Sequence, residues 1–279
     1  MSEQTFGTVA QIIRYPVKSM LGESLPTGEI TPRGLPLDRG LAFVDLDTGK
    51  IVSAKYPAKW RAMLSAQAHL NGEVKITLPG GRVVGVTDPS LDAVISDLVG
   101  RPVRLVESRN DGDTVERAIP EEVMADGLGA DVEFTLLELA EKAPGDAFAD
   151  YAPLHLITTA TLAATGAAGG AAPVDAIRYR PNIVIDSGDA EGFVENDWVG
   201  RRVLIGDEVE LEIVLPTPRC AIPTLAHGDL PPDHTPVRAL LEANRIPVEG
   251  FGVLPAAGVY AEVIRPGRIT LRDRVTVTG

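Results

Sequence analysis

The segment RVLIGDEVELEIVLPTPRC, residues 202–220, contains two strand patterns and the only cysteine of the chain. Arg202–Ile205 and Glu208–Leu215 are rich in Val, Ile and Leu, residue types that favour strands when turn residues separate them. The two prolines that follow keep the backbone out of a helix, because proline lacks an N–H group and restricts the residue before it. The segment predicts two strands followed by an extended loop that ends at Cys220.

The rest of the second half of the chain shows the same short elements. Leu154–Ile157 predicts a strand, and Thr158-Thr159 then caps an Ala-rich helix that ends at Gly169-Gly170. Further strands are predicted at Asn182–Asp186, Gly258–Ile264 and Ile269–Val277, and a further helix from Thr235-Pro236 to about Asn244.

The first hundred residues are mostly strand patterns separated by turn signals. Thr8–Arg14 predicts a strand that Tyr15-Pro16 ends, since proline cannot donate to a ladder. Two hairpins are predicted. The first has arms Leu41–Leu46 and Lys50–Ser53 around the turn Asp47-Thr48-Gly49. The second has arms Glu73–Leu78 and Arg82–Thr87 around the turn Pro79-Gly80-Gly81. A helix over Ser90–Val99 after Asp88-Pro89, closed by Gly100, and a strand over Pro102–Val106 complete this half.

These elements predict a mainly β fold with some α, built as a β-barrel-like core with a few helices. From Glu107 to about Pro144 the sequence becomes acidic and irregular. On composition we therefore divide the chain into a first domain at 1–115, an acidic connector at 116–150 and a second domain at 151–279.

The composition restricts the classes of partner. The chain has 279 residues, 44% of them hydrophobic, which is enough for one large domain or two of ordinary size. Its formal net charge of −13 argues against binding to nucleic acid and to anionic membranes. An anionic ligand would need a local basic pocket that overcomes the overall field.

Neither a membrane span nor a secretory signal is expected. No apolar run approaches the roughly 18–20 residues that cross a bilayer, and Met1–Thr5 opens without a hydrophobic region. We therefore expect a soluble, cytoplasmic protein. One cysteine excludes an internal disulfide, a Cys-X-X-Cys pair, a four-cysteine zinc site and an iron–sulfur cluster held by this chain alone. The four histidines are not at zinc-ligand spacing, so a metal cage made only of protein side chains is not expected.

Cys220 has two interpretations. A lone cysteine commonly acts as a small buried apolar side chain. Here it follows Arg219 in a proline-stiffened loop, where neighbouring positive charge favours the thiolate. A thiolate is a soft metal ligand or a nucleophile, so any redox or sulfur chemistry of the chain must involve Cys220.

Several cations lie just beyond predicted strands. Lys18 stands beside Ser19, Arg39 follows Asp38, and two arginines flank Tyr179. Each one alone is typical of a solvated surface. Together they are what an anion pocket requires, because Arg binds phosphate oxygens with two parallel hydrogen bonds and Lys supplies a point charge. The spacing leaves both interpretations open.

Three short motifs, in their order along the chain, resemble one known family. They are YPVKS at 15–19, RPNI at 180–183, and RC at 219–220 with LIGD at 204–207 before it. The set resembles the MOSC family, named after the C-terminal domain of the molybdenum cofactor sulfurase. The resemblance extends from about Thr8 to Val277, and the whole chain resembles the amidoxime-reducing components and their bacterial relatives. It implies a β-barrel-like MOSC domain after an N-terminal β-barrel-like or α+β domain.

The resemblance also implies a molybdenum–molybdopterin cofactor, whose metal is held by the pterin dithiolene, oxo or hydroxo groups and one protein thiolate. Cys220 stands at the position of that ligand and is the implied catalytic residue. Lys18, Ser19 and Arg39 match residues that hold the phosphate and pterin end of the cofactor. Arg180, Asn182, Arg219 and Tyr260 match the other cofactor contacts.

The activity that the resemblance implies is reduction of N-hydroxylated compounds such as amidoximes and hydroxylamines. Electrons would come from a separate flavin or iron–sulfur protein, since the chain reaches Gly279 without a ferredoxin-like domain. Two alternatives stay open: a sulfur carrier with a persulfide on Cys220, and a non-catalytic carrier of the cofactor. Pro218 and the segment Thr224–Asp229 depart from the family pattern around the mouth of the expected site, so the substrate is left open.

Overall fold

The computed structural model describes residues 4–278. The strands are β1 (Gln4–Arg14), β2 (Glu23–Leu25), β3 (Thr27–Ile30), β4 (Ala42–Asp45), β5 (Gln67–Asn71), β6 (Glu73–Thr77), β7 (Val83–Gly85), β8 (Val103–Val106), β9 (Thr114–Ala118), β10 (Phe134–Glu138), β11 (Leu154–Thr158), β12 (Ile183–Asp186), β13 (Arg202–Ile205), β14 (Val209–Pro218), β15 (Arg245–Val248), β16 (Gly252–Arg265), β17 (Gly267–Thr270) and β18 (Arg274–Thr278). The helices are α1 (Pro57–Trp60), α2 (Leu91–Val99), α3 (Pro120–Asp126), α4 (Thr159–Ala168) and α5 (Thr235–Ala243), with 3-10 turns η1 (Arg61–Ser65), η2 (Ala176–Arg178), η3 (Val194–Trp198) and η4 (Ile222–Thr224).

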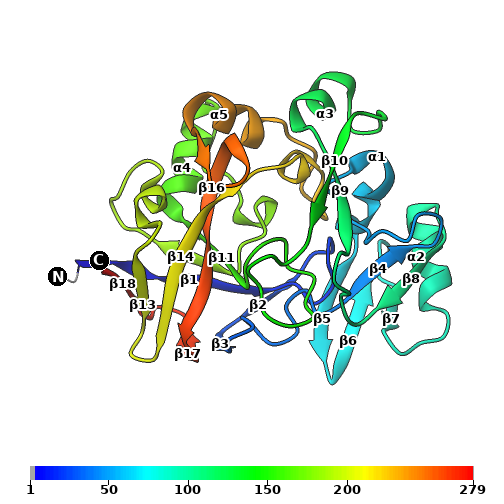
Figure 1. Ribbon diagram of the computed structural model, residues 1–279, viewed down its shortest axis with the longest axis horizontal. Helices are drawn as coiled ribbons and strands as arrows, with labels where there is room; N and C mark the ends of the chain where they lie inside the picture. Colours follow the sequence, from blue (N-terminus) through cyan, green and yellow to red (C-terminus); the bar gives the residue numbers. More distant parts are fainter. Residues whose placement is uncertain (1–3, 279) are drawn as a thin grey trace.

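One group of strands forms a closed barrel. The order is β11-β12-β1-β18-β13-β14-β16, and a further pairing of β16 with β11 closes the ring. Within this ring β11 and β12 are parallel, whereas the other neighbours are antiparallel. In Figure 1, β1 and β18 lie side by side, so the first strand belongs to the same sheet as the last. The mainly β fold with some α is confirmed.

The barrel is filled by residues that alternate along its strands, as expected when one face of each strand points inward. Val9 and Ile12 on β1, Ile213 on β14 and Val275 on β18 are buried in this core. Burying each such side chain stabilises the fold by about 1.5–3 kcal/mol. Helices α4 and α5 contact each other and lie together at one end of the barrel (Figure 1).

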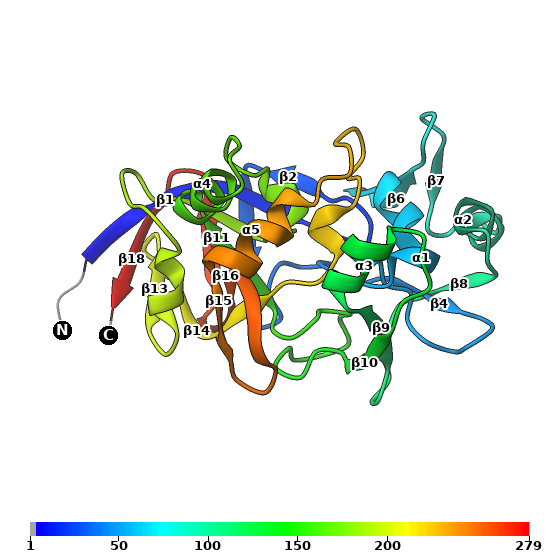
Figure 2. The same ribbon diagram turned by 90° about the horizontal axis from the view of Figure 1, so that it is seen from above.

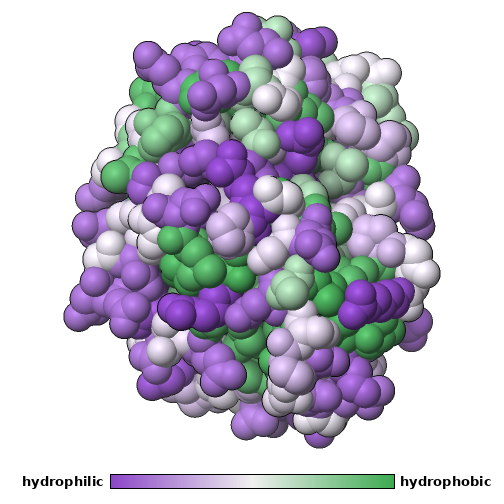
Figure 3. Space-filling view, turned by 90° about the vertical axis from the view of Figure 1, so that its right-hand side faces the viewer, coloured by the Kyte–Doolittle hydropathy of each residue, from purple (hydrophilic) through white to green (hydrophobic). Residues whose placement is uncertain are grey.

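A second unit lies beside the barrel, on the right in Figure 1 and also in Figure 2, where the molecule is seen from above. It comprises the sheet β5-β6-β7, the pair β4–β8, and the helices α1 and α2. Phe43, Trp60 and Ile95 are among the buried residues of its own core. Figure 3 shows the outer side of the molecule at this end, where hydrophilic residues predominate and apolar residues form separate patches.

Two of the chain segments that connect the barrel core to the second unit carry the motifs of the site. After β1, Tyr15 packs in a cluster beside the barrel, whereas Val17 and Met20 pack in the core of the second unit. After β14, Ala221 also enters the core of the second unit. Both segments cross the boundary between the two units, and the boundary is therefore built from the residues on either side of Lys18 and Cys220.

Several predicted elements are confirmed. The hairpin around Pro79-Gly80-Gly81 forms as β6 and β7. Helix α2 ends where Gly100 takes a left-handed conformation, with a φ of 70°. Helix α4 begins at Thr158, whose side chain accepts from the Thr161 N–H. In each case a local residue choice dictates the boundary.

Three predicted elements are wrong in detail. Segment 50–53 forms only an isolated bridge between Ile51 and Val44, and β4 takes its ladder from β8 instead. The predicted strand 269–277 is divided into β17 and β18, because Asp273 accepts from the Thr270 N–H in a turn between them. The chain before Cys220 is strand rather than loop as far as Pro218, since β14 pairs with β16 through register shifts that accommodate the prolines.

The domain boundaries at 115 and 150 stay predictions. No helix within residues 4–278 has the length and apolar composition that crossing a membrane requires.

Candidate active site

One pocket lies at the boundary between the barrel and the second unit. Its lining includes every residue to which the sequence assigned a site role, namely Lys18, Ser19, Arg39, Arg180, Asn182, Arg219, Cys220 and Tyr260. They come from the segment after β1, the loop before β4, the loop before β12, the end of β14, and β16. Residues that are far apart in the sequence are therefore brought together in one place.

The backbone at three of these residues is strained. Ser19, Arg39 and Arg180 have positive φ angles of 66°, 49° and 55°, a conformation that side chains other than Gly rarely adopt. Such residues concentrate at functional sites, because the surrounding structure must hold them there. The strain marks the same pocket independently of the motifs.

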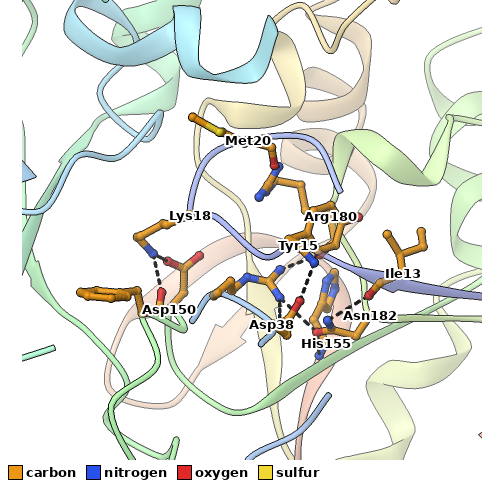
Figure 4. A network of polar contacts seen from close by, with 11 residues as sticks. Ile13, Tyr15, Lys18, Met20, Asp38, Asp150, His155, Arg180 and Asn182 are labelled. Atoms are coloured by element: carbon orange, nitrogen blue, oxygen red, sulfur yellow. Dashed lines mark hydrogen bonds and ion pairs between the residues drawn. The ribbon is translucent and has the colours of Figure 1, made fainter. Parts of the chain in front are cut away.

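Tyr15 organises two arginines of the pocket. The guanidinium carbons of Arg39 and Arg180 lie 4.9 Å and 4.4 Å from the centre of its ring, within cation–π range. Arg39 also pairs with Asp38 and donates to the Arg180 carbonyl (Figure 4). Burial lowers the pKa of Arg180 to about 10, because the protein compensates the charge of the guanidinium less well than water does. An anion that binds beside Arg180 would supply the missing compensation.

A second cationic group shares one carboxylate. Asp150 lies 2.7 Å from the Lys18 ammonium and 3.1 Å from that of Lys55. Burial opposes ionisation of Asp150, yet the two lysines hold its pKa well below the usual value. Burial, together with the nearby charges of Lys55 and Arg39, lowers the pKa of Lys18 to about 8 even though Asp150 acts in the opposite direction. One carboxylate does not neutralise two ammonium groups.

The lowered pKa of Lys18 predicts a pH dependence of anion binding. Lys18 is charged below about pH 8 and loses its proton as the pH rises through that value, well before an exposed lysine would. We expect the affinity of the cofactor-free protein for sulfate, whose charge is constant in this range, to fall by up to about tenfold per pH unit above pH 8. Isothermal titration calorimetry measures this. The variant Lys18→Met should bind more weakly with a flatter profile, and an unchanged profile would contradict the assignment.

Arg219 and Cys220 lie at the end of β14. The Arg219 guanidinium is buried, donates to the carbonyls of Tyr179 and Ala257, and contacts Nε2 of His155. Burial lowers its pKa, and the nearby tyrosines act in the opposite direction. Cys220 is 9% exposed and packs with aliphatic neighbours while lining the pocket. The thiol is thus sheltered on the protein side and accessible from the pocket.

Asn182 supports this arrangement from within the barrel. Its amide donates to the Ile13 carbonyl and accepts from the His155 N–H and, at 3.3 Å, from Arg39 (Figure 4). Its hydrogen bonds therefore connect β1 and β11 to the pocket arginines.

Gly258 allows the close approach of β16 to His155. Its φ is +76°, and a Cβ there would collide with Nε2 of His155 and lie 2.5 Å from the Leu156 carbonyl oxygen. Gly252, on the same strand, has a φ of +88° and open space around it. We expect Gly258→Ala to lower the free energy of unfolding by about 1–3 kcal/mol more than Gly252→Ala, because only the first adds a steric clash to the backbone strain. Urea unfolding measures the difference, and equal losses would show that the clash is relieved.

Several lining residues were missed from the sequence: Lys55, Arg117, Asp150 and Tyr151. Asp150 is one of 39 acidic residues and lies at the edge of the acidic segment, where nothing local distinguishes it. Arg178 was among the cations expected to form an anion pocket and does line it, although the sequence assigned it no specific role. It is buried and donates to the carbonyls of Pro223, Leu225 and Pro231, which fixes the loop after Cys220.

The pocket is strongly cationic in an acidic protein. Seven Lys and Arg side chains line it, against one carboxylate. Among residues 4–278 no group of three or more His, Cys, Asp and Glu side chains could hold a metal ion. The arrangement can bind a multiply charged anion beside a single thiol.

Comparisons with known proteins agree with this picture. Family profiles match the chain twice, the MOSC N-terminal β-barrel domain over residues 6–119 and the MOSC domain over residues 145–276. A curated relative, the mitochondrial amidoxime reducing component 2 of Rattus norvegicus, is 28% identical over 246 residues, which cover 80% of this chain and 68% of that protein.

Solved structures give weaker likenesses. The YUAD protein from Bacillus subtilis aligns over 99% of this chain and 97% of its own, with a TM-score of 0.46 and 10% identity. A hypothetical protein aligns over 52% of this chain and 64% of its own, with a TM-score of 0.31 and 16% identity. The two profiles together account for most of the sequence, so the chain belongs to the MOSC family, in the form in which a MOSC domain follows a MOSC N-terminal β-barrel domain.

Proposed function

We propose that the protein is a molybdenum-cofactor-dependent oxidoreductase that reduces N-hydroxylated compounds such as amidoximes and hydroxylamines. The observation that carries the proposal is the position of Cys220: the only thiol of the chain lines a pocket with seven cationic side chains. The similarity to an amidoxime reducing component supports the choice of reaction.

The residues present fit a molybdenum–molybdopterin cofactor. A soft thiolate suits the metal, and a multiply anionic ligand suits a pocket with far more cations than carboxylates. Cys220 would hold the metal, with Lys18, Ser19 and Arg39 at the phosphate and pterin end. The remaining contacts would come from Arg180, Asn182, Arg219 and Tyr260. When bound, the cofactor supplies two-electron oxygen-atom chemistry at its metal.

The chain's own residues would orient and enclose the reacting groups. Arg178 and Arg219 hold the segments around Cys220 through backbone carbonyls, so the thiol keeps one position relative to the cations. Reduction of an amidoxime to an amidine consumes two electrons and two protons and releases water. We assign the electrons to a separate flavin or iron–sulfur protein and the reaction to the cytoplasm.

The test is turnover by protein produced where cofactor synthesis is intact. We expect near-stoichiometric molybdenum by elemental analysis, and conversion of benzamidoxime to benzamidine when a reduced viologen dye supplies electrons. Molybdenum without turnover of amidoximes or hydroxylamines would favour a cofactor carrier. Labile sulfane sulfur on Cys220 in metal-free protein would favour a sulfur carrier.

A further inference from the structure

The hairpin β9–β10 contributes one wall of the pocket. In Figure 1 it lies between the barrel and the second unit, and its strands pair Arg117 with Thr135 and Val115 with Leu137. Residues two apart on a strand share a face, so Arg117 lies on the same face of the hairpin as Leu137. Both of these residues line the pocket.

Arg117 lies next to the peptide that leads to the thiol. Its guanidinium donates to the Arg219 carbonyl at 3.3 Å, and Arg219 directly precedes Cys220. The neighbouring Glu116 points to the other face of the hairpin, where it pairs with Lys50 and Lys59. Within residues 4–278, no carboxylate lies within 4.0 Å of the Arg117 guanidinium.

Most other cations of the pocket have partners or are enclosed. Lys18 and Lys55 share Asp150, and Arg39 pairs with Asp38. The arginines at 178, 180 and 219 are less than 9% exposed and donate to backbone carbonyls. Arg117 has no such carboxylate partner among residues 4–278 and, unlike the arginines at 178, 180 and 219, is only partly buried. Its hydrogen bond to the Arg219 carbonyl uses one of its five N–H groups. A group arriving from solvent can reach it.

Apolar residues share the pocket with Arg117. Leu137, Pro218, Ile222, Pro223 and Phe251 line the same pocket, and Phe251 packs edge-on against Tyr151 with ring centres 5.9 Å apart. A partly buried guanidinium without a carboxylate partner, in a pocket that also has apolar lining, is complementary to a ligand that has an apolar body and one carboxylate, since Arg binds carboxylates with two parallel hydrogen bonds.

We propose that Arg117 determines substrate specificity by binding the carboxylate of N-hydroxylated substrates that carry one on an apolar or aromatic body. The inference rests on the proposed function and adds the substrate class. The reaction is that of any amidoxime: the N–O bond breaks, two electrons from the separate donor protein and two protons are taken up, and amidine and water are formed. The carboxylate itself is unchanged.

The experiment compares benzamidoxime with 4-carboxybenzamidoxime on the cofactor-loaded protein and three variants. Arg117→Met removes the charge, and Arg117→Lys keeps the charge but lacks the planar guanidinium group. Arg104→Met, which removes an exposed charge on β8, is the matched control. Binding is measured by calorimetry on oxidised protein, turnover with reduced viologen dye, and cofactor loading by molybdenum analysis.

We expect wild type and Arg104→Met to bind the carboxylated compound in preference to the neutral one. In Arg117→Met the preference should fall by about 10- to 100-fold, the usual effect of one charge-assisted hydrogen bond, with unchanged molybdenum and unchanged binding of benzamidoxime. Arg117→Lys should recover part of the preference.

Two results would overturn the inference. One is an equal preference in wild type and Arg117→Met. The other is a loss of molybdenum in Arg117→Met, which would make Arg117 a cofactor contact. Binding is measured without turnover, so the two proposals can fail separately. An inactive wild-type protein would contradict the proposed function, whereas the binding preference alone would decide the role of Arg117.

Discussion

Protein with Cys220 replaced by alanine should contain almost no molybdenum, and its turnover of N-hydroxylated substrates should fall by at least about a hundredfold. The expected loss follows from the donor set, because Cys220 is the only cysteine of the chain. The seven Lys and Arg side chains of the lining hold anions but donate no electron pair to a metal when charged. Elemental analysis of wild type and variant, prepared side by side, measures the effect.

The substitution is mild for the fold, so its effect on the metal can be separated from unfolding. Cys220 packs in a small cluster with Ala54, Leu64, Ile222 and Leu225, and exchanging a thiol for a methyl removes little volume. We expect a cost of about 1 kcal/mol in unfolding free energy and an unchanged circular dichroism spectrum.

Cys220→Ser provides a second control, since it keeps the shape but replaces soft sulfur with a harder hydroxyl oxygen. It should also lose the metal. Full molybdenum in either variant would make Cys220 a buried apolar side chain, which is the other interpretation that its sequence context allows.

The second large effect is expected at Asp150. In Asp150→Asn the ammonium groups of Lys18 and Lys55 lose their shared carboxylate. Breaking a buried ion pair typically costs about 3–5 kcal/mol. The Asp150 side chain is 29% exposed, so water offsets part of this, and we expect about 2–3 kcal/mol less unfolding free energy near pH 6 in the cofactor-free protein.

The size of this loss should depend on pH. Asp150 raises the pKa of Lys18, so the variant should have a Lys18 pKa below the wild-type value of about 8. Towards pH 9 Lys18 is mostly neutral in the folded state of both proteins, and the contribution of its pair with Asp150 disappears. The destabilisation by Asp150→Asn should therefore be smaller at pH 9 than at pH 6.

Urea unfolding at the two pH values measures the change, with Asp146→Asn as the control because Asp146 is exposed and close in sequence. A loss that is equal at both pH values would mean that Lys55, rather than Lys18, accounts for the coupling. No loss at either value would contradict the ion-pair arrangement.

Much of the fold follows from local sequence. Gly100 ends α2, Thr158 starts α4, and the Pro-Gly-Gly turn connects β6 to β7, because each depends on backbone preferences of a few adjacent residues. The motifs around Lys18, Arg180 and Cys220 likewise identified the family before any pairing of strands was known. These features require no knowledge of distant residues.

Strand partners depend on the whole chain. β1 lies between β12 and β18, and β4 pairs with β8 rather than with the residues that follow its turn. A strand pattern shows which side chains face inward, but the choice of partner is made by packing among all elements. The long strand predicted at 269–277 was wrong for this reason, since its two parts pair with different strands.

The sequence by itself determined many of the elements, the family and the single thiol. Only the tertiary structure decided which charges meet around that thiol. Lys18 and Asp150 are 132 residues apart, and Arg117 reaches the carbonyl of Arg219 across 102. Such contacts form only when the barrel and the second unit pack against each other. The residues adjacent to a charged side chain do not indicate which distant residue will pair with it in the folded protein.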